Sequence, residues 1–368
     1  MKKLIFVGPL LPPITGQSIA FGIVNENITH SLTINTAKFN NRVINTLYVI
    51  AKYLHILTFP KGSVIYFTCS RSNLGFVKDL FLLLIGRFRS MVIVNHVHGS
   101  DFSTFTGQKG FLGNIIRYFY KNINHTILLL EEMEEQLFQF PNSKFTIIPN
   151  CYSEDFERYE ISEEIDICKA VDNEYVTIAY VSNIIFSKGI LFLLDSVEFI
   201  LEIGLPVRFK IAGDFVSDEF LSKEEIRAVF IERILNIRER YNDSIEYVGI
   251  VSGLGKYKLL AESSIFILPS FYKSEAFPIS IIEAMRMGNA IITTNYRYLP
   301  CIINISNGRI IQPKNVSEIV SSISELILNR NMLIGIQKNN IEIAKRKYSQ
   351  QIYIRDIESL LNTFLNLE

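Results

Sequence analysis

Two glutamates, Glu275 and Glu283, stand eight residues apart in the segment SEAFPISIIEAM and could bind a ligand rich in hydroxyl groups. Carboxylate oxygens are good acceptors for the paired hydroxyls of a sugar. Pro278 lies between them and suits the first residue of a helix, whose free N–H groups and positive dipole end attract phosphate. Two surface glutamates beside a loop would have the same spacing, so spacing alone leaves both interpretations open.

The N-terminal half offers two further segments with candidate chemistry. In GPLLPPITGQSIAF (8–21) a strand leads through a loop into a helix that begins near Gly16, where the missing side chain would let the loop approach a phosphate. Many α/β proteins have such a turn. In NHVHGSDF (95–102), His96 and His98 would share one face of a strand and suggest a metal pair. No third ligand is evident, so we expect no metal site.

Several other classes of protein are excluded by what the sequence lacks. It has no P-loop and no Gly-x-Ser-x-Gly motif, and no basic residues interleaved with aromatics that would favour nucleic-acid binding. The four cysteines lie far apart and form no Cys-x-x-Cys pair: Cys69, Cys151, Cys168 and Cys301. This spacing argues against a zinc site and against a disulfide framework, and fits a reducing compartment.

The elements that must position these residues alternate regularly along the first 150 residues. Buried parallel strands are predicted at 4–8, 63–68, 91–97, 125–130 and 145–150, and helices at 17–30, 73–87, 111–122 and 131–140. This alternation of strand and helix is typical of a doubly wound α/β domain.

The alternation stops after Asn150 and begins again at residue 175. The intervening residues 152–174 are acidic and poor in long apolar runs, which indicates a linker. Strands are predicted beyond it at 175–182, 207–213, 245–249, 265–270, 290–295 and 309–313, with helices at 188–203, 220–240, 254–262, 278–287, 315–330 and 332–363. We therefore predict domains at 1–160 and 175–335, a linker at 161–174, and a helical segment at 336–368 that could pack back toward the first domain.

Charge and hydropathy suggest an anionic partner for the N-terminal half. Residues 1–150 hold 14 basic and 7 acidic residues, a net charge of 14 − 7 = +7, although the whole chain is neutral. A membrane surface, a lipid diphosphate or a nucleic acid would suit this half, and a merely dipolar soluble protein is the alternative. The apolar run at 80–86 is too short to span a bilayer and indicates a core helix, and its place in the basic half leaves a membrane-facing role open.

The segment SEAFPISIIEAMRMGNAIITTN resembles the Glu-x7-Glu segment of the retaining glycosyltransferases of family 4, which have the GT-B fold. Further segments resemble that family in YVGIVSGLGKYKLLAESSIFILPS, VSNIIFSKGI, IAGD and NGRIIQPKNVSEIVSSI. The resemblance is clear from about 175 to 330 and weaker but consistent from 1 to 150. It implies two Rossmann-like doubly wound domains facing each other across a cleft, the first binding the acceptor and the second the nucleotide sugar.

The resemblance implies a role for each residue of the donor site. Glu275 would contact the donor sugar and Glu283 the ribose of the nucleotide. Lys188 would neutralise the diphosphate, a task that suits a compact cation with three donors, although a solvated lysine at a helix start is the alternative. The backbone that opens the following helix would lie along the sugar and the diphosphate: Phe277, Pro278 and Ile279.

Other positions gain expected roles from the same resemblance. Gly16, Gly213 and Val248 would lie beside the donor nucleotide or sugar. His98, directly before Gly99, matches a histidine that faces the donor sugar, where it could bond a hydroxyl or help to stabilise positive charge near the anomeric centre. Asp101 could contact the acceptor, although a loop aspartate without a role fits equally well.

Three departures from the family pattern concern the phosphate and acceptor contacts. Asn183 stands where the family usually has an arginine, so one positive charge on the diphosphate is missing or supplied elsewhere, with Arg297 in the loop NYRYLP as the candidate. Cys301 stands where a glutamate is common. Thr15 and Gly16 stand where family members often have two glycines.

The resemblance predicts a hexosyltransferase that moves a hexosyl unit, with retention, from a nucleoside-diphosphate sugar to a saccharide. UDP is the expected nucleotide. The expected acceptor is linked to undecaprenyl diphosphate in the assembly of O-antigen, lipopolysaccharide, capsule or exopolysaccharide, with a soluble acceptor as the competitor. We expect a cytoplasmic protein that is peripheral on the inner face of the membrane. The Asp-x-Asp motif of the other large glycosyltransferase fold is absent, so we expect no metal and no cofactor besides the donor as co-substrate.

Two functions of other classes remain open on the sequence. A sugar-nucleotide epimerase or a glycogen-phosphorylase-like enzyme would share the two-domain architecture. A non-catalytic protein that binds UDP-sugar would fit the loss of the arginine at Asn183.

Overall fold

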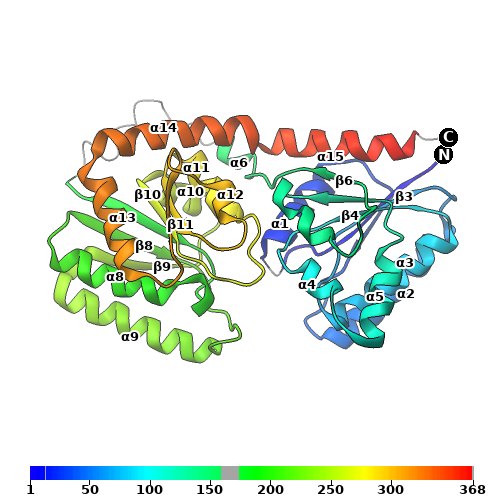
Figure 1. Cartoon of the computed structure of the whole chain (residues 1–368), viewed down its shortest axis with the longest axis horizontal. Helices are drawn as coiled ribbons and strands as arrows, with labels where there is room; N and C mark the ends of the chain where they lie inside the picture. Colours follow the sequence, from blue (N-terminus) through cyan, green and yellow to red (C-terminus); the bar gives the residue numbers. More distant parts are fainter. Residues whose placement is uncertain (13, 159–173, 367–368) are drawn as a thin grey trace. The chain divides into compact units, whose positions relative to one another are not determined.

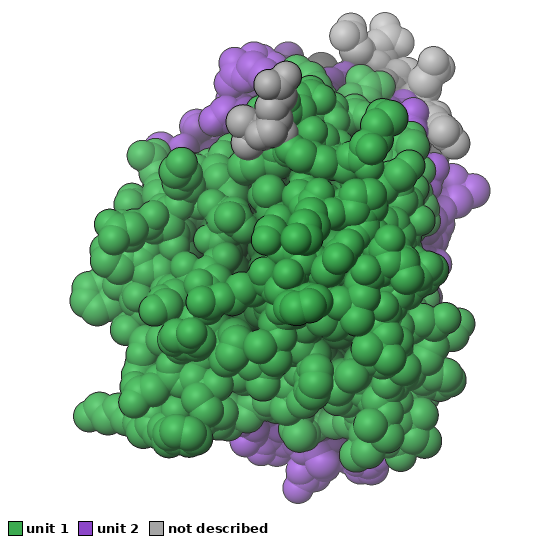
Figure 2. Space-filling model, turned by 90° about the vertical axis from the view of Figure 1, so that its right-hand side faces the viewer, with its two compact units in different colours: residues 1–151, 350–368 green, residues 152–349 purple. Residues whose placement is uncertain are grey.

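The computed structural model describes residues 1–12, 14–158 and 174–366. It contains two compact units: unit 1 comprises residues 1–151 and 350–368, and unit 2 comprises residues 152–349 (Figure 1, Figure 2). The chain therefore leaves unit 1 after Cys151 and returns to it at Gln350. Of the predicted linker at 161–174, all but Glu174 lies outside the described residues.

Unit 1 is built on a six-stranded parallel sheet with the order β2-β1-β3-β4-β5-β6. Its strands are β1 (Leu4–Gly8), β2 (Leu32–Asn35), β3 (Val64–Phe67), β4 (Val92–His96), β5 (His125–Leu128) and β6 (Phe145–Ile147). The apolar pattern predicts all of them except β2. This strand escapes prediction because it is a short edge strand in which only Ile34 is buried.

Helices cover both faces of the unit 1 sheet (Figure 1). On one face α15 (Gln350–Leu365) packs beside α1 (Gly16–Asn27) and buries Tyr353, Ile357 and Leu361, which are spaced four residues apart. The other face carries α2 (Arg42–Tyr53), α3 (Asn73–Phe88) and α5 (Gly110–Tyr120). Shorter turns complete the unit: η1 (Leu54–Thr58), α4 (Phe102–Thr106) and η2 (Glu131–Leu137).

Two predicted helices differ from the structure. The pattern at 131–140 forms the 3₁₀ segment η2. This segment contains four glutamates, each of them three or four residues from another. Repulsion between like charges at that spacing disfavours an α-helix. The pattern at 332–363 is divided into α14 (Arg330–Lys347) and α15. The division falls at Tyr348 and Ser349, where the chain passes from unit 2 to unit 1.

Unit 2 repeats the architecture with a parallel sheet of order β12-β11-β10-β7-β8-β9. Its strands are β7 (Val176–Val181), β8 (Val207–Ala212), β9 (Ile245–Gly249), β10 (Ile265–Leu268), β11 (Ala290–Thr294) and β12 (Gly308–Ile311). Its helical segments are α6 (Asp155–Arg158), η3 (Phe186–Lys188), α8 (Ile190–Glu202), α9 (Lys223–Tyr241), η4 (Asn242–Ser244), α10 (Gly253–Ala261), α11 (Ile279–Arg286), α12 (Leu299–Ile302), α13 (Val316–Leu328) and α14. All six predicted strands of this half are confirmed.

Among the described helices, none is by itself long and apolar enough to cross a bilayer, whereas the bent pair Val316–Leu328 and Arg330–Leu365, with an angle of 97°, passes the test of length and composition.

A buried asparagine cluster ties α14 to the segment that follows α11. The side-chain amide of Asn340 donates to the carbonyl oxygens of Asn289, at 2.7 Å, and Asn307, at 2.8 Å. In return, Asn340 accepts a bond of 2.9 Å from the Asn307 amide. Each of the three side chains is at most 2% exposed. The cluster therefore fixes how α14 supports α11 and β11, which flank the candidate site.

We expect Asn340→Ala to lower the free energy of unfolding by about 3 kcal/mol, because it leaves buried carbonyl and amide groups without a partner. Urea titration followed by circular dichroism measures the loss. Asn339→Ala is the matched control, since Asn339 also bonds a backbone carbonyl, that of Ser306 at 2.8 Å, but only on the surface. A loss of the same size in both variants would contradict the role given to the buried cluster.

Candidate functional site

The parallel strands β7 and β10 are neighbours in the unit 2 sheet, so their carboxyl ends lie side by side. The strand order of the sheet reverses between these two strands. From β7 the sheet continues to β8 and β9, whereas from β10 it continues the other way to β11 and β12. Ligands of doubly wound folds bind at such a switch point, beyond the carboxyl ends of the strands. The loops that follow β7 and β10 carry Lys188 and Glu275.

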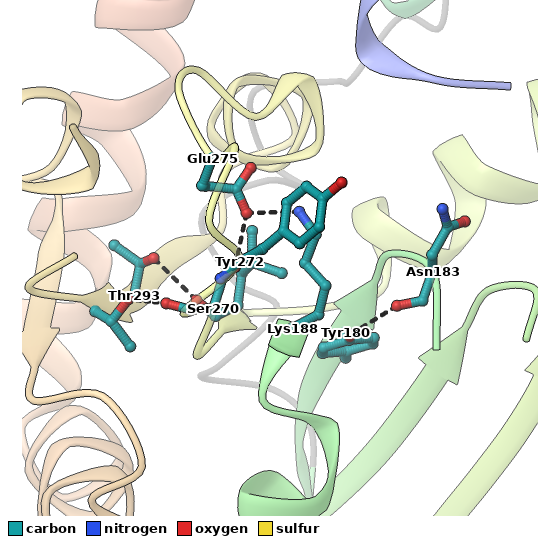
Figure 3. A network of polar contacts seen from close by, with 9 residues as sticks. Tyr180, Asn183, Lys188, Ser270, Tyr272, Glu275 and Thr293 are labelled. Atoms are coloured by element: carbon teal, nitrogen blue, oxygen red, sulfur yellow. Dashed lines mark hydrogen bonds and ion pairs between the residues drawn. The ribbon is translucent and has the colours of Figure 1, made fainter. Parts of the chain in front are cut away.

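Glu275 and Lys188 form a largely buried ion pair at this switch point (Figure 3). The Nζ atom of Lys188 lies 2.5 Å from Oε2 of Glu275, and the side chains are 14% and 7% exposed. The same carboxylate oxygen accepts a bond of 2.7 Å from the Ser270 hydroxyl. Lys188 also lies 5.2 Å from the centre of the Tyr272 ring. Two residues predicted to bind the donor are therefore brought together although 87 positions separate them.

Close backbone contacts hold the two loops in this position. The N–H of Phe271 donates to the carbonyl oxygen of Ser187 at 2.8 Å. Gly189 has a left-handed φ of +78°, and a Cβ atom there would lie 2.1 Å from the carbonyl oxygen of Pro269. Only glycine satisfies both conditions without a shift of the backbone. The position of Lys188 thus depends on its neighbour in the chain.

The helix predicted after Glu275 begins one residue later than expected. Pro278 has an extended ψ of 121° and is the N-cap residue, so α11 starts at Ile279. The first N–H groups of α11 have no partner within the helix and are available to an anion. The Phe277 side chain is buried with its ring centre 5.4 Å from that of Tyr348. The backbone of Phe277, and not its buried side chain, could therefore reach a ligand.

Glu283 lies further along α11 and has its own lysine. Its side chain is 5% exposed and pairs with Nζ of Lys256, from α10. Burial raises the pKa of Glu283, and the charge of Lys256 acts in the opposite direction. Lys256 was missed by the sequence reasoning, because no motif marks a lysine that reaches the site from another helix.

The other predicted donor positions of unit 2 lie at the ends of neighbouring strands. Asn183 is exposed after β7, and its carbonyl oxygen accepts a bond of 3.1 Å from the Tyr180 hydroxyl. Gly213 follows β8, where a Cβ atom would lie 1.8 Å from the carbonyl oxygen of Ser182. Val248 is half-buried near the end of β9, and Arg297 is exposed after β11, 5.7 Å from the ring of Tyr296. That Arg297 replaces the missing arginine stays a prediction.

Two histidines of unit 1, His96 and His98, lie ring against ring at the end of β4. The rings of His96 and His98 are centred 4.0 Å apart, and His96 Nδ1 lies 2.7 Å from the Tyr66 hydroxyl. Burial lowers the pKa of His96, and burial together with the nearby charge of Arg71 lowers the pKa of His98 to about 3. Both rings are therefore neutral at pH 7. Within the described ranges, no group of three or more His, Cys, Asp or Glu side chains is placed to hold a metal ion.

Arg71 is a candidate that the sequence reasoning missed. It follows β3, and its Nε atom lies 2.5 Å from Oδ1 of Asp101, the predicted acceptor contact. The guanidinium group rests on Gly99, where a Cβ atom would lie 2.5 Å from its Cζ atom. The rule that ligands meet the carboxyl ends of strands could have found Arg71, since β3 was predicted correctly. Which ligand group Asp101 and His98 contact stays a prediction.

A buried carboxyl group supports the segment that carries Arg71. Asp79 of α3 accepts a bond of 2.7 Å from the N–H of Ser70 and one of 2.5 Å from the hydroxyl of Tyr120. Burial raises the pKa of Asp79 to about 6, although these hydrogen bonds and Lys78 act against the rise.

Gly16 is the first residue of α1, whose N-cap is Thr15. The Thr15 side chain and Ser18 form a reciprocal capping box, which fixes the start of the helix. No atom lies within 4 Å of a Cβ atom built on Gly16. The protein itself therefore does not require glycine here, and the predicted approach of a phosphate stays a prediction.

The fold of the chain is that of the GT-B glycosyltransferases. Sucrose-phosphate synthase from Thermosynechococcus elongatus matches with a TM-score of 0.73 at 15% identity, over 99% of each chain. A glycosyltransferase from Rickettsia africae matches with a TM-score of 0.72 at 16% identity, over 100% of each chain. Anabaena HepE, solved in complex with UDP-glucose, matches with a TM-score of 0.73 at 14% identity, over 98% of this chain and 100% of its own. Identities this low establish the fold alone.

Residues 175–329, which lie within unit 2, match the family model of the group 1 glycosyl transferases. The capsular polysaccharide biosynthesis glycosyltransferase CapM of Staphylococcus aureus is 23% identical over 214 residues, which make up 57% of this chain and 52% of that protein. The N,N'-diacetylbacillosaminyl-diphospho-undecaprenol alpha-1,3-N-acetylgalactosaminyltransferase of Campylobacter jejuni is 31% identical over 104 residues, or 27% and 26% of the two chains. The chain thus spans about half the length, or less, of the curated relatives it matches.

We expect Gly189→Ala to lower the free energy of unfolding by about 3 kcal/mol, because the added methyl group meets Pro269 and the backbone is left-handed. Gly204→Ala is the matched control: Gly204 has a similar φ of +73° but no atom within 4 Å of the added Cβ. The control should lose only about 1 kcal/mol. Urea titration measures both, and equal losses would show that the close approach of the two loops contributes nothing.

We expect Asp79→Asn to change how stability depends on pH. The pKa of Asp79 is raised from 3.8 to about 6 in the folded protein, so its protonated form stabilises the fold. This contribution is fully present below pH 3.8 and is lost as the pH rises through 6. The stability of the wild type relative to Asp79→Asn should therefore fall by on the order of 3 kcal/mol from pH 4 to pH 7. Parallel pH profiles of the two proteins would rule the effect out.

Proposed function

We propose that the chain transfers a hexosyl unit from a UDP-sugar to a lipid-linked saccharide, with retention, during the assembly of a bacterial surface polysaccharide. The observation that carries this is the buried pair of Lys188 and Glu275, at the switch point of a domain of the group 1 glycosyltransferase family. The reaction would take place at the inner face of the membrane, where lipid-linked acceptors are presented.

Lys188 would supply the positive charge for the donor diphosphate. Its side chain is mostly buried, and a cation in such surroundings attracts a phosphate more strongly than a solvated one. The free N–H groups at the start of α11 would add to this attraction. When the donor binds, its phosphate would share Lys188 with Glu275.

The Glu275 carboxylate would hold the donor sugar. Lys188 and Ser270 both bond its Oε2 atom. Within the described chain Oε1 has no hydrogen bond, so it would accept one from a sugar hydroxyl. Glu283, which pairs with Lys256, would accept the ribose hydroxyls.

The chemistry would need little from the protein beyond charge and position. The bond between the anomeric carbon and the diphosphate oxygen breaks while the acceptor oxygen attacks from the same face. The proton of the acceptor hydroxyl passes to the leaving phosphate, so we assign no protein base. Negative charge grows on the diphosphate during this step, and Lys188 and the start of α11 would stabilise it there.

The relatives support the class of acceptor. The Campylobacter protein is named for an acceptor on diphospho-undecaprenol and the staphylococcal protein for capsular polysaccharide biosynthesis. The Anabaena structure of the same fold holds UDP-glucose, which supports UDP as the nucleotide. We propose that no metal takes part, since the sequence lacks an Asp-x-Asp motif.

One observation favours a second function. Asn183 is exposed and carries no charge at a position where the family usually has an arginine. A protein that binds UDP-sugar without transferring it would tolerate that loss. Such a protein would be stabilised by the donor and yet form no product.

A panel of UDP-sugars tests the proposed function. The correct donor should raise the midpoint of thermal unfolding, since a ligand at about 100 times its Kd stabilises the fold by about 2.7 kcal/mol. Transfer from that donor to undecaprenyl-diphosphate saccharides, with and without EDTA, then reports the reaction. Stabilisation without any product would favour the binding protein, and conversion of the donor without an acceptor would favour an epimerase.

We expect Glu275→Gln to reduce transfer at least about 100-fold while the protein stays folded, because the donor sugar loses its charged acceptor. Glu262→Gln is the matched control, since Glu262 also pairs with a lysine, at 2.7 Å from Lys210, but is 58% exposed and lies outside the site. The control should keep full activity. Turnover of Glu275→Gln near that of the wild type would sink the assignment.

A further inference from the structure

Helix α3 of unit 1 turns a row of large apolar side chains away from its sheet. Leu74, Val77, Phe81, Leu84 and Phe88 are all exposed, by 36% to 77%. Their spacing of three and four residues places them within roughly 80° of one another around the helix, at about 100° per residue. The opposite side of α3 packs on the sheet and is buried. The predicted core run at 80–86 is therefore core on one side only.

The helices on either side of α3 repeat this arrangement. α2 contacts α3 and exposes Val43, Ile44 and Leu47, which are 54% to 68% exposed. α5 contacts α3 from the other side and exposes Phe111 and Leu112, by 82% and 40%. In α2 the buried residues lie on the opposite side, toward the sheet. In α5 the side opposite Phe111 is buried, through Gly113, Ile116 and Tyr120. We call the outward side of these three helices the α2–α3–α5 face; Figure 1 shows the helices together.

The segment of the chain that contains these three helices is strongly basic. Residues 27–130 contain 11 lysines and arginines against 2 acidic residues, a net charge of 11 − 2 = +9. Both acids are already engaged, since Asp79 is buried with Ser70 and Tyr120, and Asp101 pairs with Arg71. No acidic residue stands on the outward side of the three helices.

Two tyrosines, one exposed and one half-buried, lie beside basic side chains of these helices. Tyr118 of α5 is 47% exposed and lies 4.8 Å from Nζ of Lys121. Its hydroxyl accepts a bond of 3.2 Å from Arg87 of α3. On α2, Lys52 lies 5.7 Å from the ring of Tyr48. Rings and long basic stems with one apolar and one polar end suit the boundary between hydrocarbon and water.

We propose that the α2–α3–α5 face binds the surface of an anionic lipid bilayer. A monomeric protein rarely leaves a contiguous apolar surface of three helices in water, so something covers this one. Lipid supplies both needs at once: the acyl region takes the apolar side chains, and anionic headgroups take the lysines and arginines. The core of a protein interface is instead depleted of lysine, whereas Lys52 and Lys121 stand at the ends of the helices that expose the apolar residues.

Binding through this face deepens the proposed function by naming what holds the enzyme near a lipid-linked acceptor. Its test is independent of that function, because vesicle binding is measured without donor or acceptor. The full chain is floated with vesicles of phosphatidylglycerol and phosphatidylcholine, and with vesicles of phosphatidylcholine alone. We expect binding to the anionic vesicles that weakens as salt is raised.

Two variants assign the binding to this face. Phe81→Ser with Phe88→Ser should weaken it roughly tenfold or more through lost apolar burial. Lys52→Gln with Lys121→Gln should weaken it roughly fivefold for each lysine lost. The matched controls lie in unit 2: Phe199→Ser with Leu328→Ser, exposed by 55% and 75%, and Lys338→Gln with Lys347→Gln. The controls should bind as the wild type does.

Three results would overturn the proposal. The first is equal binding to both kinds of vesicle, or none to either. The second is an equal loss in the face variants and in the unit 2 controls. The third is a wild-type dimer that Phe81→Ser with Phe88→Ser turns into a monomer while vesicle binding is unchanged, which would make the face an interface between copies. Unchanged circular dichroism of every variant excludes unfolding as the cause of a loss.

Discussion

The ion pair of Lys188 and Glu275 joins two loops that follow neighbouring strands but stand 87 residues apart in the chain. Removing two charges from water costs several kcal/mol for each, and their attraction repays this only with good geometry and further hydrogen bonds. Here Ser270 supplies such a bond, and the two loops approach so closely that only glycine fits at residue 189. A packed apolar pair would stabilise these loops equally well, so the charges are better explained by a ligand than by folding.

The same arrangement recurs at the second glutamate. Glu283 is buried against Lys256, so each carboxylate of the site has a lysine of its own. Each pair joins a carboxylate to an ammonium group, so the attraction between the partners offsets part of the cost of burying them. A diphosphate entering such a site does not meet a surplus of positive charge. Under the proposed function it would compete with the carboxylates for the lysines, and the uncharged N–H groups of α11 would then contribute more to its binding.

The sequence predicts an element correctly where several buried positions follow one another along the same strand or helix. The strands β7 and β10 of unit 2 are mostly apolar and buried, and Lys188 and Glu275 stand in the segments that follow them. Lys256 and Arg71 were missed because their importance depends on which helix or loop lies opposite, and spacing along the chain does not record that. The edge strand β2 was missed for a related reason, since an element buried at one position has no pattern to detect.

The run at 80–86 shows what composition cannot distinguish. Seven residues with only apolar side chains or glycine predict a core helix, yet Phe81 and Leu84 face outward while Leu82 and Leu83 are buried. The hydropathy of the segment includes both sides of the helix, whereas the exposure of each side chain distinguishes the outward side from the buried one. The neutral net charge of the chain conceals the basic segment 27–130 in the same way, because acidic residues elsewhere cancel it. An apolar row and a basic segment can be interpreted together only after the fold has shown that both belong to the same helices. That coincidence makes the face of unit 1 a binding surface and explains why neither property alone predicts it.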